Sequence, residues 1–535
     1  MGMLTCRYDE LEIREGLSIR NADHAGLDRQ RTDTRLHKKG RDCMKANSVF
    51  MGIDAGTTKL KLMLYDAQMK EIGSSSRDTK IYIPENGASE IDMNELWMSL
   101  CEAAQELKRN FPEQMACLTG LGISGQGDGL WPLDKDGKPA CRAILWNDSR
   151  SKIMNIDAIE GLAALQSKEC MNTVFAGSMP GIQKWLKAKH PDTYAKIRHS
   201  LHCKDWLNYC LTGRIVSDYS DITCSSGMNM LTLQYVPEFY RLLGIEEALD
   251  TMPEAVEPTD VIGTVSEEAS RLTGIPAGVK VIAGCLDCCA ASAGSDFYRD
   301  GEGCSVIGTA MINEICQTRE QIDPNDLRGL LLYHVAPERY IKIMNTAGGS
   351  SCADFVRKLV APGISFDELF EELDKIPIGS NGLIYHPYLY GERAPFKDPD
   401  ASGAFIGLRN YHTKFDMVRA AYEGLAMMFV DCYRAVNPVS VVYLSGGAAV
   451  SPFVCQLFCD AIGLPVKRQT IDELGTLGIV KMLKIGLGEA KNYDELTIDS
   501  YIDYVPDPER HAKYEKLYER FVATRDSLAP YWKQD

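Results

Sequence analysis

The chain has 535 residues, of which 45% are apolar and 25% are charged, and its formal net charge is −16. This length predicts two large domains or three smaller ones. The composition excludes a wholly disordered chain, a collagen-like chain and a coiled-coil rod. No run of 18 apolar residues occurs, so no membrane span is expected. The acidic balance disfavours nucleic-acid binding, because an acidic surface repels phosphate backbones.

The 18 cysteines are spread through the chain, many of them within apolar stretches. No secretory signal precedes them, so we expect reduced, buried thiols in a cytoplasmic protein. Cys285 and Cys288 form one C-x-x-C pair with no second pair and no nearby histidine. A single such pair is weak evidence for zinc, and no zinc site is expected.

Residues 1–43 differ from the rest of the chain. They hold nine Lys or Arg and eight Asp or Glu, with no Phe or Trp. Such a segment can bury little apolar surface, so it is predicted to be a disordered extension. We therefore expect the functional chain to start near Met44.

The first predicted strand covers residues 49–54 and ends in Asp54. A polar turn, residues 55–59, separates it from a second strand over 60–65. This order matches neither the P-loop nor the dinucleotide fingerprint. The turn still offers backbone N–H groups, the Thr57 and Thr58 hydroxyls and Lys59 as donors to phosphate, and Asp54 is placed to hold Mg²⁺ through water. A plain hairpin is the alternative.

The second half repeats this theme. Residues 279–284 read as a strand, Cys285-Leu286-Asp287 follows it, and a helix of small residues begins at 288. A further strand, 304–307, ends in the turn Gly308-Thr309. An aspartate between a strand end and a helix start suits catalysis, although from the pattern alone a helix cap is the stronger interpretation.

A third turn, Ser445-Gly446-Gly447-Ala448, follows a predicted strand over 441–445 and precedes an apolar helix over 453–461. Glycines allow a flat ligand to approach the backbone. Two further helices, around 415–436 and 514–521, carry apolar residues at steps of three and four and are expected to pack in the core.

Together, five ordered motifs resemble the FGGY family of carbohydrate kinases. They are the first phosphate motif at 52–59, the sugar-binding segments at 122–131 and 143–150, the catalytic-base and second phosphate segment at 284–287 and 308–309, the motif at 388–408, and the adenosine motif at 445–448. The resemblance runs from about residue 49 to about residue 506. It therefore covers nearly all of the chain beyond the extension.

The resemblance implies an α/β fold with two actin-like (ribonuclease H-like) domains flanking a deep catalytic cleft. It assigns residues 44–296 to an N-terminal domain on the sugar side and 297–535 to a C-terminal domain on the nucleotide side. It implies an enzyme that uses ATP and Mg²⁺ to phosphorylate a small sugar or polyol, with domain closure that excludes water. A homodimer is common in the family.

The resemblance also implies residue roles. Asp287 would be the general base that accepts the proton of the attacking hydroxyl group and contacts the substrate. Asp54 would position Mg²⁺. The remaining expected ligands are, for the phosphates, Thr57, Thr58, Lys59, Gly308 and Thr309; for adenosine, Gly446, Gly447 and Ala448; and for the sugar, Gln126, Asp128, Trp131 and Trp146.

The sugar segment departs from the D-xylulose kinase pattern, in which Gln-Met-His is usual. Here Gln126-Gly127-Asp128 looks more like L-xylulose and erythritol kinases. We expect a ketopentose such as xylulose or L-xylulose as substrate, with erythritol or another polyol as the alternative. Glycerol kinase fits this segment poorly. Segment 122–150 argues against an actin-like ATPase of another kind, and Asp54 and Asp287 argue against a catalytically silent sugar sensor.

Overall fold

The computed structural model describes residues 48–533, which fall within one compact unit containing two seven-stranded sheets. The predicted extension over residues 1–43 and the expected start near Met44 lie outside the described residues. Within residues 48–533, no helix has the length and apolar character needed to cross a membrane.

The first sheet has the strand order β14-β15-β6-β1-β2-β3, and β16 also pairs with β6. Its strands are β1 Val49–Ala55, β2 Lys59–Tyr65, β3 Glu71–Asp78, β6 Leu118–Gly125, β14 Val261–Thr264, β15 Lys280–Ile282 and β16 Cys285–Leu286. The predicted strand–turn–strand is confirmed, because β1 and β2 pair as antiparallel neighbours. β1 is parallel to β6, and β6 is parallel to β15 and β16. Parallel strands buried on both faces explain the continuous apolar run of β1.

The second sheet has the order β19-β20-β18-β17-β23-β24-β25. Its strands are β17 Glu302–Ile307, β18 Met311–Thr318, β19 Leu330–Tyr333, β20 Arg339–Asn345, β23 Val441–Ser445, β24 Val466–Gln469 and β25 Tyr501–Tyr504. β17 and β18 form an antiparallel hairpin, and β17 is parallel to β23. The series β20-β18-β17-β23-β24 thus repeats the series β3-β2-β1-β6-β15 of the first sheet. Two copies of this topology are what the resemblance predicts.

Helices cover both sheets. Their bounds are α2 Met93–Asn110, α3 Pro112–Ala116, α4 Leu162–Leu165, α5 Met179–Lys189, α6 Pro191–Tyr194, α7 Cys203–Thr212, α8 Tyr219–Cys224, α9 Pro237–Leu243, α10 Glu267–Thr273, α11 Asp287–Gly294, α12 Ser350–Val360, α13 Phe366–Asp374, α14 Lys414–Arg434, α15 Pro452–Ile462, α16 Leu474–Gly486 and α17 Pro508–Leu528. Both predicted core helices form, and α17 buries Tyr514, Leu517 and Phe521. The short strands lie in small sheets: β4 Ile81–Tyr82, β5 Glu90–Ile91 and β8 Ala143–Ile144; β7 Trp131–Leu133 and β9 His199–Leu201; β10 Val216–Asp218 and β13 Glu254–Val256; β11 Met228–Asn229 and β12 Gln234–Tyr235; β21 Ile384–His386 and β22 Ala404–Ile406.

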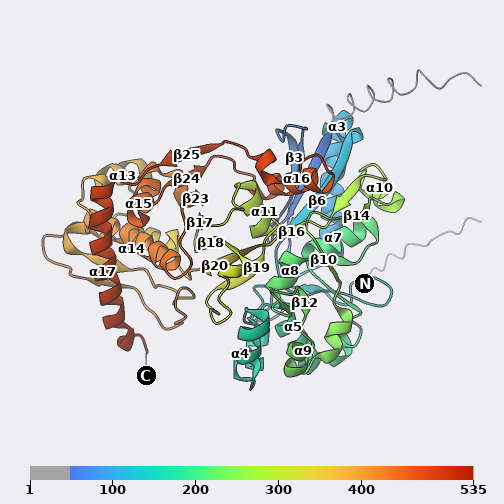
Figure 1. Cartoon of the computed structure of the whole chain (residues 1–535), viewed down its shortest axis with the longest axis horizontal. Helices are drawn as coiled ribbons and strands as arrows, with labels where there is room; N and C mark the ends of the chain where they lie inside the picture. The colour runs from blue at the N-terminus through green and yellow to red at the C-terminus, as the bar shows by residue number, and fades with distance from the viewer. Residues whose placement is uncertain (1–47, 534–535) are drawn as a thin grey trace, which may run out of the picture. The chain divides into compact units, whose positions relative to one another are not determined.

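Helix α16 comes late in the chain yet packs on the first sheet, beside β1 and β6 (Figure 1). The approach is close, since a Cβ atom added to Gly52 would lie 2.3 Å from the carbonyl oxygen of Thr476. Gly120 and Gly122 on β6 likewise face Leu483 and Ile479 of α16. Glycines on β1 and β6 therefore let a buried, apolar helix lie against the strands that lead to the site.

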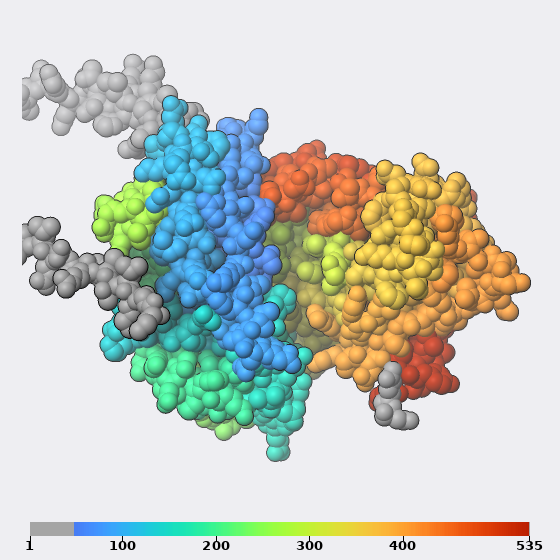
Figure 2. Space-filling view, turned by 180° about the vertical axis from the view of Figure 1, so that it is seen from behind, coloured from blue at the N-terminus to red at the C-terminus, as the bar shows by residue number. Residues whose placement is uncertain are grey.

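Figure 2 shows a hollow between the surface formed by the blue segments early in the chain and that formed by the yellow and orange segments late in the chain. The yellow-green middle of the chain lies within this hollow. Strands β1, β6 and β16 end in the turns that carry most of the predicted sugar-side residues.

Candidate active site

The predicted acidic and amide residues lie at one edge of the first sheet, at the ends of three neighbouring parallel strands. In the register of the sheet, Asp54 of β1 pairs with Ser124 of β6, and Ser124 pairs with Cys285 of β16. Gln126 and Asp287 follow directly after β6 and β16. Because parallel strands end on the same side, these side chains gather where ligands bind in α/β sheets.

Asp287 is the first residue of α11. The N-cap residue is Leu286, so helix capping does not account for this aspartate. The Cys288 N–H group donates to its Oδ1 at 2.7 Å. The side chain remains exposed to solvent, yet desolvation by the surrounding protein and the like charge of Asp54 raise its pKa to about 7. A carboxyl group with a pKa near neutrality suits a general base.

Asp54 is held by one neighbour and keeps one oxygen available. Ser124 Oγ donates to Asp54 Oδ1 at 3.0 Å, and no hydrogen bond from the described residues reaches Oδ2. The nearby Lys61 forms its ion pair with Glu473, at 2.6 Å. Burial raises the pKa of Asp54, and the hydrogen bond from Ser124 and the charge of Lys61 offset this only in part. An aspartate with a free oxygen and no direct cation partner can hold a divalent metal ion.

Thr57 joins the predicted phosphate turn to the predicted sugar segment. Its hydroxyl group donates to Gln126 Oε1 at 3.1 Å and accepts from Trp146 Nε1 at 3.1 Å. Trp146 is 44% exposed and so has surface to offer a ligand. Thr58 and Lys59 are both exposed. The structure thus brings Thr57, Gln126 and Trp146 together and leaves Thr58 and Lys59 open to solvent.

Gln126 and Asp128 both have a buried polar atom without a partner among the described residues. These atoms are Gln126 Nε2 and Asp128 Oδ2. The other oxygen of Asp128 accepts from Met179 N at 2.7 Å and from Ser225 Oγ at 2.9 Å. Buried polar atoms are rarely left unpaired. One unpaired donor and one unpaired acceptor, two residues apart, are the complement of sugar hydroxyl groups.

The backbone around Asp128 is also unusual. Asp128 has φ of 53° and Gly129 has φ of 74°, both in the left-handed region. At Gly127, an added Cβ would lie 1.8 Å from Leu286 Cδ1. The missing side chain therefore makes room for the residue that precedes Asp287. Strained backbone of this kind gathers at functional sites.

Trp131, one of the two tryptophans expected to line the sugar pocket, is fully buried. It has no exposed surface and belongs to the hydrophobic core under the first sheet. Its place in β7, within an apolar run, gives it a packing role. Its Nε1 is a buried donor without a partner among the described residues, so its place in the sugar pocket stays a prediction. Trp146 is the tryptophan that has exposed surface and contacts Thr57.

The second group of predicted residues lies at the ends of β17 and β23, which are parallel neighbours. The carbonyl oxygen of Gly308 accepts from Ser350 N at 2.9 Å and from Ser350 Oγ at 2.7 Å, which holds this turn against α12. Thr309 is exposed. Within residues 48–533, no hydrogen bond joins this group directly to Asp54, Gln126 or Asp287.

The glycines after β23 have distinct surroundings. Gly446 has φ of 93°, and an added Cβ would lie 2.8 Å from backbone atoms of Ile307. Gly447 is exposed and has open space at the same position, while Ala448 is half-buried. Gly446 is thus required by the packing of the two strands, whereas Gly447 leaves room for a ligand.

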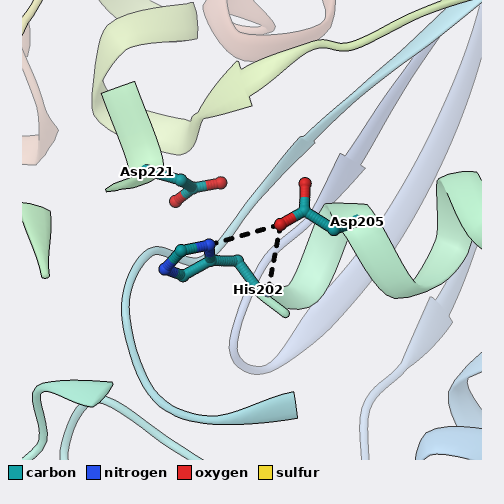
Figure 3. Close-up of side chains that lie close together, drawn as sticks. All are labelled: His202, Asp205 and Asp221. Carbon is teal, nitrogen blue, oxygen red and sulfur yellow. Dashed lines mark hydrogen bonds and ion pairs between the residues drawn. The ribbon is translucent and has the colours of Figure 1, made fainter. Parts of the chain in front are cut away.

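The sequence analysis missed a buried charged cluster beside this site. Lys204 Nζ lies 2.5 Å from Asp205 Oδ1, 2.8 Å from Asp218 Oδ1 and 3.0 Å from Asp221 Oδ2. His202, Asp205 and Asp221 also place ligand atoms within 4.8 Å of one another (Figure 3). Because an ammonium group already neutralises these carboxylates, we assign no metal ion to this cluster.

The cluster contacts both sides of the sugar site. Ser225 Oγ lies 3.0 Å from His202 Nε2 and donates to Asp128. At the other side, Leu286 N donates to Ser220 Oγ at 3.0 Å, immediately before Asp287. A signal was present in the sequence, since Lys204 and Asp205 interrupt an otherwise apolar stretch. Asp218 and Asp221 lie more than ten residues away, and only the fold brings them to Lys204.

The chain matches two family models, the N-terminal domain of the FGGY family of carbohydrate kinases over residues 49–294 and the C-terminal domain over residues 303–485. A probable L-xylulose kinase of Haemophilus influenzae is 27% identical, covering 90% of this chain and 99% of that protein. The erythritol kinase of Brucella abortus is 27% identical, covering 90% and 97%. The ligand-bound xylulose kinase of Lactobacillus acidophilus has a similar fold, with a TM-score of 0.84 and 24% identity, covering 90% and 98%.

Proposed function

Because this chain belongs to the FGGY family of carbohydrate kinases, we propose that it transfers the terminal phosphoryl group of ATP to a hydroxyl group of a small ketose or polyol, with Asp287 as general base. It is a carbohydrate kinase, with the two-domain actin-like fold of that family. The observation that carries the residue assignment is the convergence of Asp54, Gln126 and Asp287 at the ends of three adjacent strands.

In the proposed reaction, Asp287 accepts the proton of the attacking hydroxyl group as the oxygen bonds to phosphorus. Its raised pKa keeps it able to take up that proton near neutral pH. Gln126 Nε2 and Asp128 Oδ2 bind substrate hydroxyl groups, and Trp146 lines the pocket. A sugar that lacks one of these hydroxyl groups leaves a buried partner unpaired, which gives sharp discrimination.

On the nucleotide side, the exposed Thr58, Lys59 and Thr309, together with the Gly308 backbone, are proposed to hold phosphate oxygens. Gly447 and Ala448 are proposed to lie against adenosine, with Gly446 fixing the turn. Asp54 fits Mg²⁺ because its Oδ2 is free and Lys61 is paired elsewhere. When bound, Mg²⁺ would supply positive charge to the nucleotide phosphates.

The substrate is proposed to be a ketopentose of the L-xylulose type, with D-xylulose, erythritol or another polyol as alternatives. The support is Gln126-Gly127-Asp128 and the similarity to an L-xylulose kinase and an erythritol kinase. We also propose domains over residues 44–296 and 297–535, and a homodimer as in the family. A cytoplasmic location is proposed, since the cysteines within residues 48–533 are free thiols.

The test is ADP release from ATP and Mg²⁺ with purified protein and a panel of sugars. The panel contains L- and D-xylulose, L- and D-ribulose, erythritol, glycerol and several ketohexoses. We expect one strong substrate among the ketopentoses or erythritol. Silence with all sugars, together with retained ATP binding, would instead favour a sugar sensor.

A further inference from the structure

A continuous line of hydrogen bonds runs from Asp128 into the protein interior. Ser225 Oγ donates to Asp128 Oδ1 at 2.9 Å, and His202 Nε2 lies 3.0 Å from the same Ser225 oxygen. On the opposite side of the imidazole ring, Nδ1 lies 3.2 Å from Asp205 Oδ2 and 3.2 Å from Ser217 Oγ. All five side chains are buried. Because they are buried, their polar atoms must find hydrogen-bond partners within the protein.

The count of hydrogens fixes the charge of His202. A serine hydroxyl group has one hydrogen, and Ser225 donates it to Asp128. The Ser225 oxygen can then only accept from His202, so Nε2 carries a hydrogen. Burial alone would raise the pKa of Asp205, but Lys204 Nζ, 2.5 Å from its Oδ1, opposes that effect and favours the ionised carboxylate. Asp205 is thus an acceptor, and the 3.2 Å contact requires a hydrogen on Nδ1 as well.

We propose that His202 is an imidazolium ion that acts through Ser225 as a positioning residue, keeping Asp128 ionised and its Oδ2 available to the sugar. This inference rests on the proposed function, in which Asp128 binds a substrate hydroxyl group. His202 itself does not contact the substrate. It sets the charge and orientation of the carboxylate that does.

The surrounding charges agree with this assignment. Burial disfavours a charged His202, but Asp221 and Asp205 outweigh it and raise the pKa of His202. Figure 3 shows both carboxylates directed toward the ring. Burial raises the pKa of Asp128 to about 6, and the charge of His202 is the largest influence that lowers it.

Other titratable groups also face this line of contacts. They are Lys204, Asp205 and Cys203 on α7, Asp218 at the end of β10, Asp221 and Cys224 on α8, Tyr235 on β12, and Asp287 on α11. The carboxylates in this set favour protonation of both His202 and Asp128, whereas Lys204 opposes it. Because the positive charge of His202 favours the ionised form of Asp128, removing that charge should move the pKa of Asp128 upward. Asp128 would then be protonated over more of the neutral range.

The first test reads the charge state directly. Protein labelled with ¹⁵N in histidine is studied by NMR at pH 7.5, and the His202 signals are assigned with the variant His202→Gln. We expect both ring nitrogens to carry hydrogens, as in imidazolium. A neutral tautomer, with one nitrogen unprotonated, would overturn the proposal. This readout does not require catalysis.

The second test measures the sugar dissociation constant against pH in the absence of nucleotide. In His202→Gln, which keeps a donor but cannot carry the charge, we expect sugar affinity at pH 7 to fall about tenfold, as when a charge-assisted hydrogen bond is lost. The pH at which sugar binding weakens should rise by about one unit. Ser225→Ala should weaken binding similarly, and His199→Gln, on the nearby β9, should leave it unchanged.

The outcomes distinguish the proposed kinase function from the proposed role of His202. If no sugar is phosphorylated, the proposed function fails, whatever the NMR result. If a sugar is phosphorylated but His202→Gln and Ser225→Ala both bind it like the unmodified protein, only the role of His202 fails. If His202→Gln does not fold, the sugar affinity of Ser225→Ala still decides, and unchanged binding by that variant would overturn the role of His202.

Discussion

Thr57 Oγ1 lies 3.1 Å from Gln126 Oε1, so the turn that resembles a phosphate motif touches a residue of the sugar segment. The same hydroxyl group accepts from Trp146. Its hydrogen-bonding capacity is thus directed toward the sugar side. We infer that Thr57 orients Gln126 and leaves the phosphates to Thr58, Lys59 and the turn backbone.

Replacing Thr57 with valine, which has the same shape but no hydroxyl group, should weaken sugar recognition. Loss of a partner for buried Gln126 is expected to raise the sugar KM about tenfold, with a smaller effect on the ATP KM. Thr57→Ser keeps the hydroxyl group and serves as the matched control. Steady-state kinetics with each substrate varied in turn would decide, and an effect on the ATP KM alone would contradict this role.

Gly127→Ala tests whether this glycine exists to accommodate Leu286. The new methyl group would lie 1.8 Å from Leu286 Cδ1, which must move. Since Leu286 precedes Asp287, we expect turnover to fall. Leu286→Ala in the same chain should restore part of it, because the clash is removed. Comparison of kcat for the two single variants and the double variant measures this coupling; strictly additive effects would refute it.

Gly446→Ala and Gly447→Ala should separate folding from nucleotide binding. Alanine at 446 clashes with the Ile307 backbone and requires positive φ, so we expect a free-energy loss of at least about 1 kcal/mol on thermal unfolding. Alanine at 447 meets open space, so the Tm should hardly change while the ATP KM rises. If Gly447→Ala leaves ATP binding intact, the adenosine assignment is wrong.

The sequence predicted the pair β1 and β2 and the strand β17, because each depends on residues that are contiguous in the chain. The strand predicted over 279–284 to open a repeat in the second half is instead β15 of the first sheet, and the repeated topology followed from the family resemblance. β1 with β2 and the turn after β17 depend on local residue patterns. The packing of α16 on β1 and the cluster around Lys204 could not be predicted, since their partners are far apart in the sequence. For Trp131, a motif position alone does not distinguish a core side chain from a pocket wall, and its buried Nε1 without a partner among the described residues leaves its predicted role open to test.

Lys204→Met should be severely destabilising. It removes the ammonium group that neutralises three buried carboxylates, a change that typically costs about 3–5 kcal/mol. Without the lowering effect of Lys204, the pKa values of Asp205 and Asp221 should rise, so the variant should recover part of its stability as the pH falls toward 6. Urea unfolding at pH 6 and pH 8 would measure this.

In protein prepared without nucleotide and Mg²⁺, a chelator should not change the Tm, because Lys204 Nζ already pairs with the Asp205 and Asp221 carboxylates. A fall in Tm with chelator would instead indicate a metal in the His202, Asp205 and Asp221 group.

The role of Asp287 also predicts the pH dependence. Its pKa is raised to about 7, so the protonated, inactive form gains population as the pH falls below neutrality. The kcat/KM for the sugar should therefore decline from pH 8 to pH 6. A flat profile across this range would argue against Asp287 as the base that is titrated.

The most direct test of the account compares ADP release by the unmodified protein and by Asp287→Asn, with ATP, Mg²⁺ and the best sugar of the panel. General-base catalysis contributes about 10²–10⁴-fold, so kcat should fall by that factor while calorimetry still detects ATP and sugar binding. Near-normal turnover by Asp287→Asn would contradict the central claim.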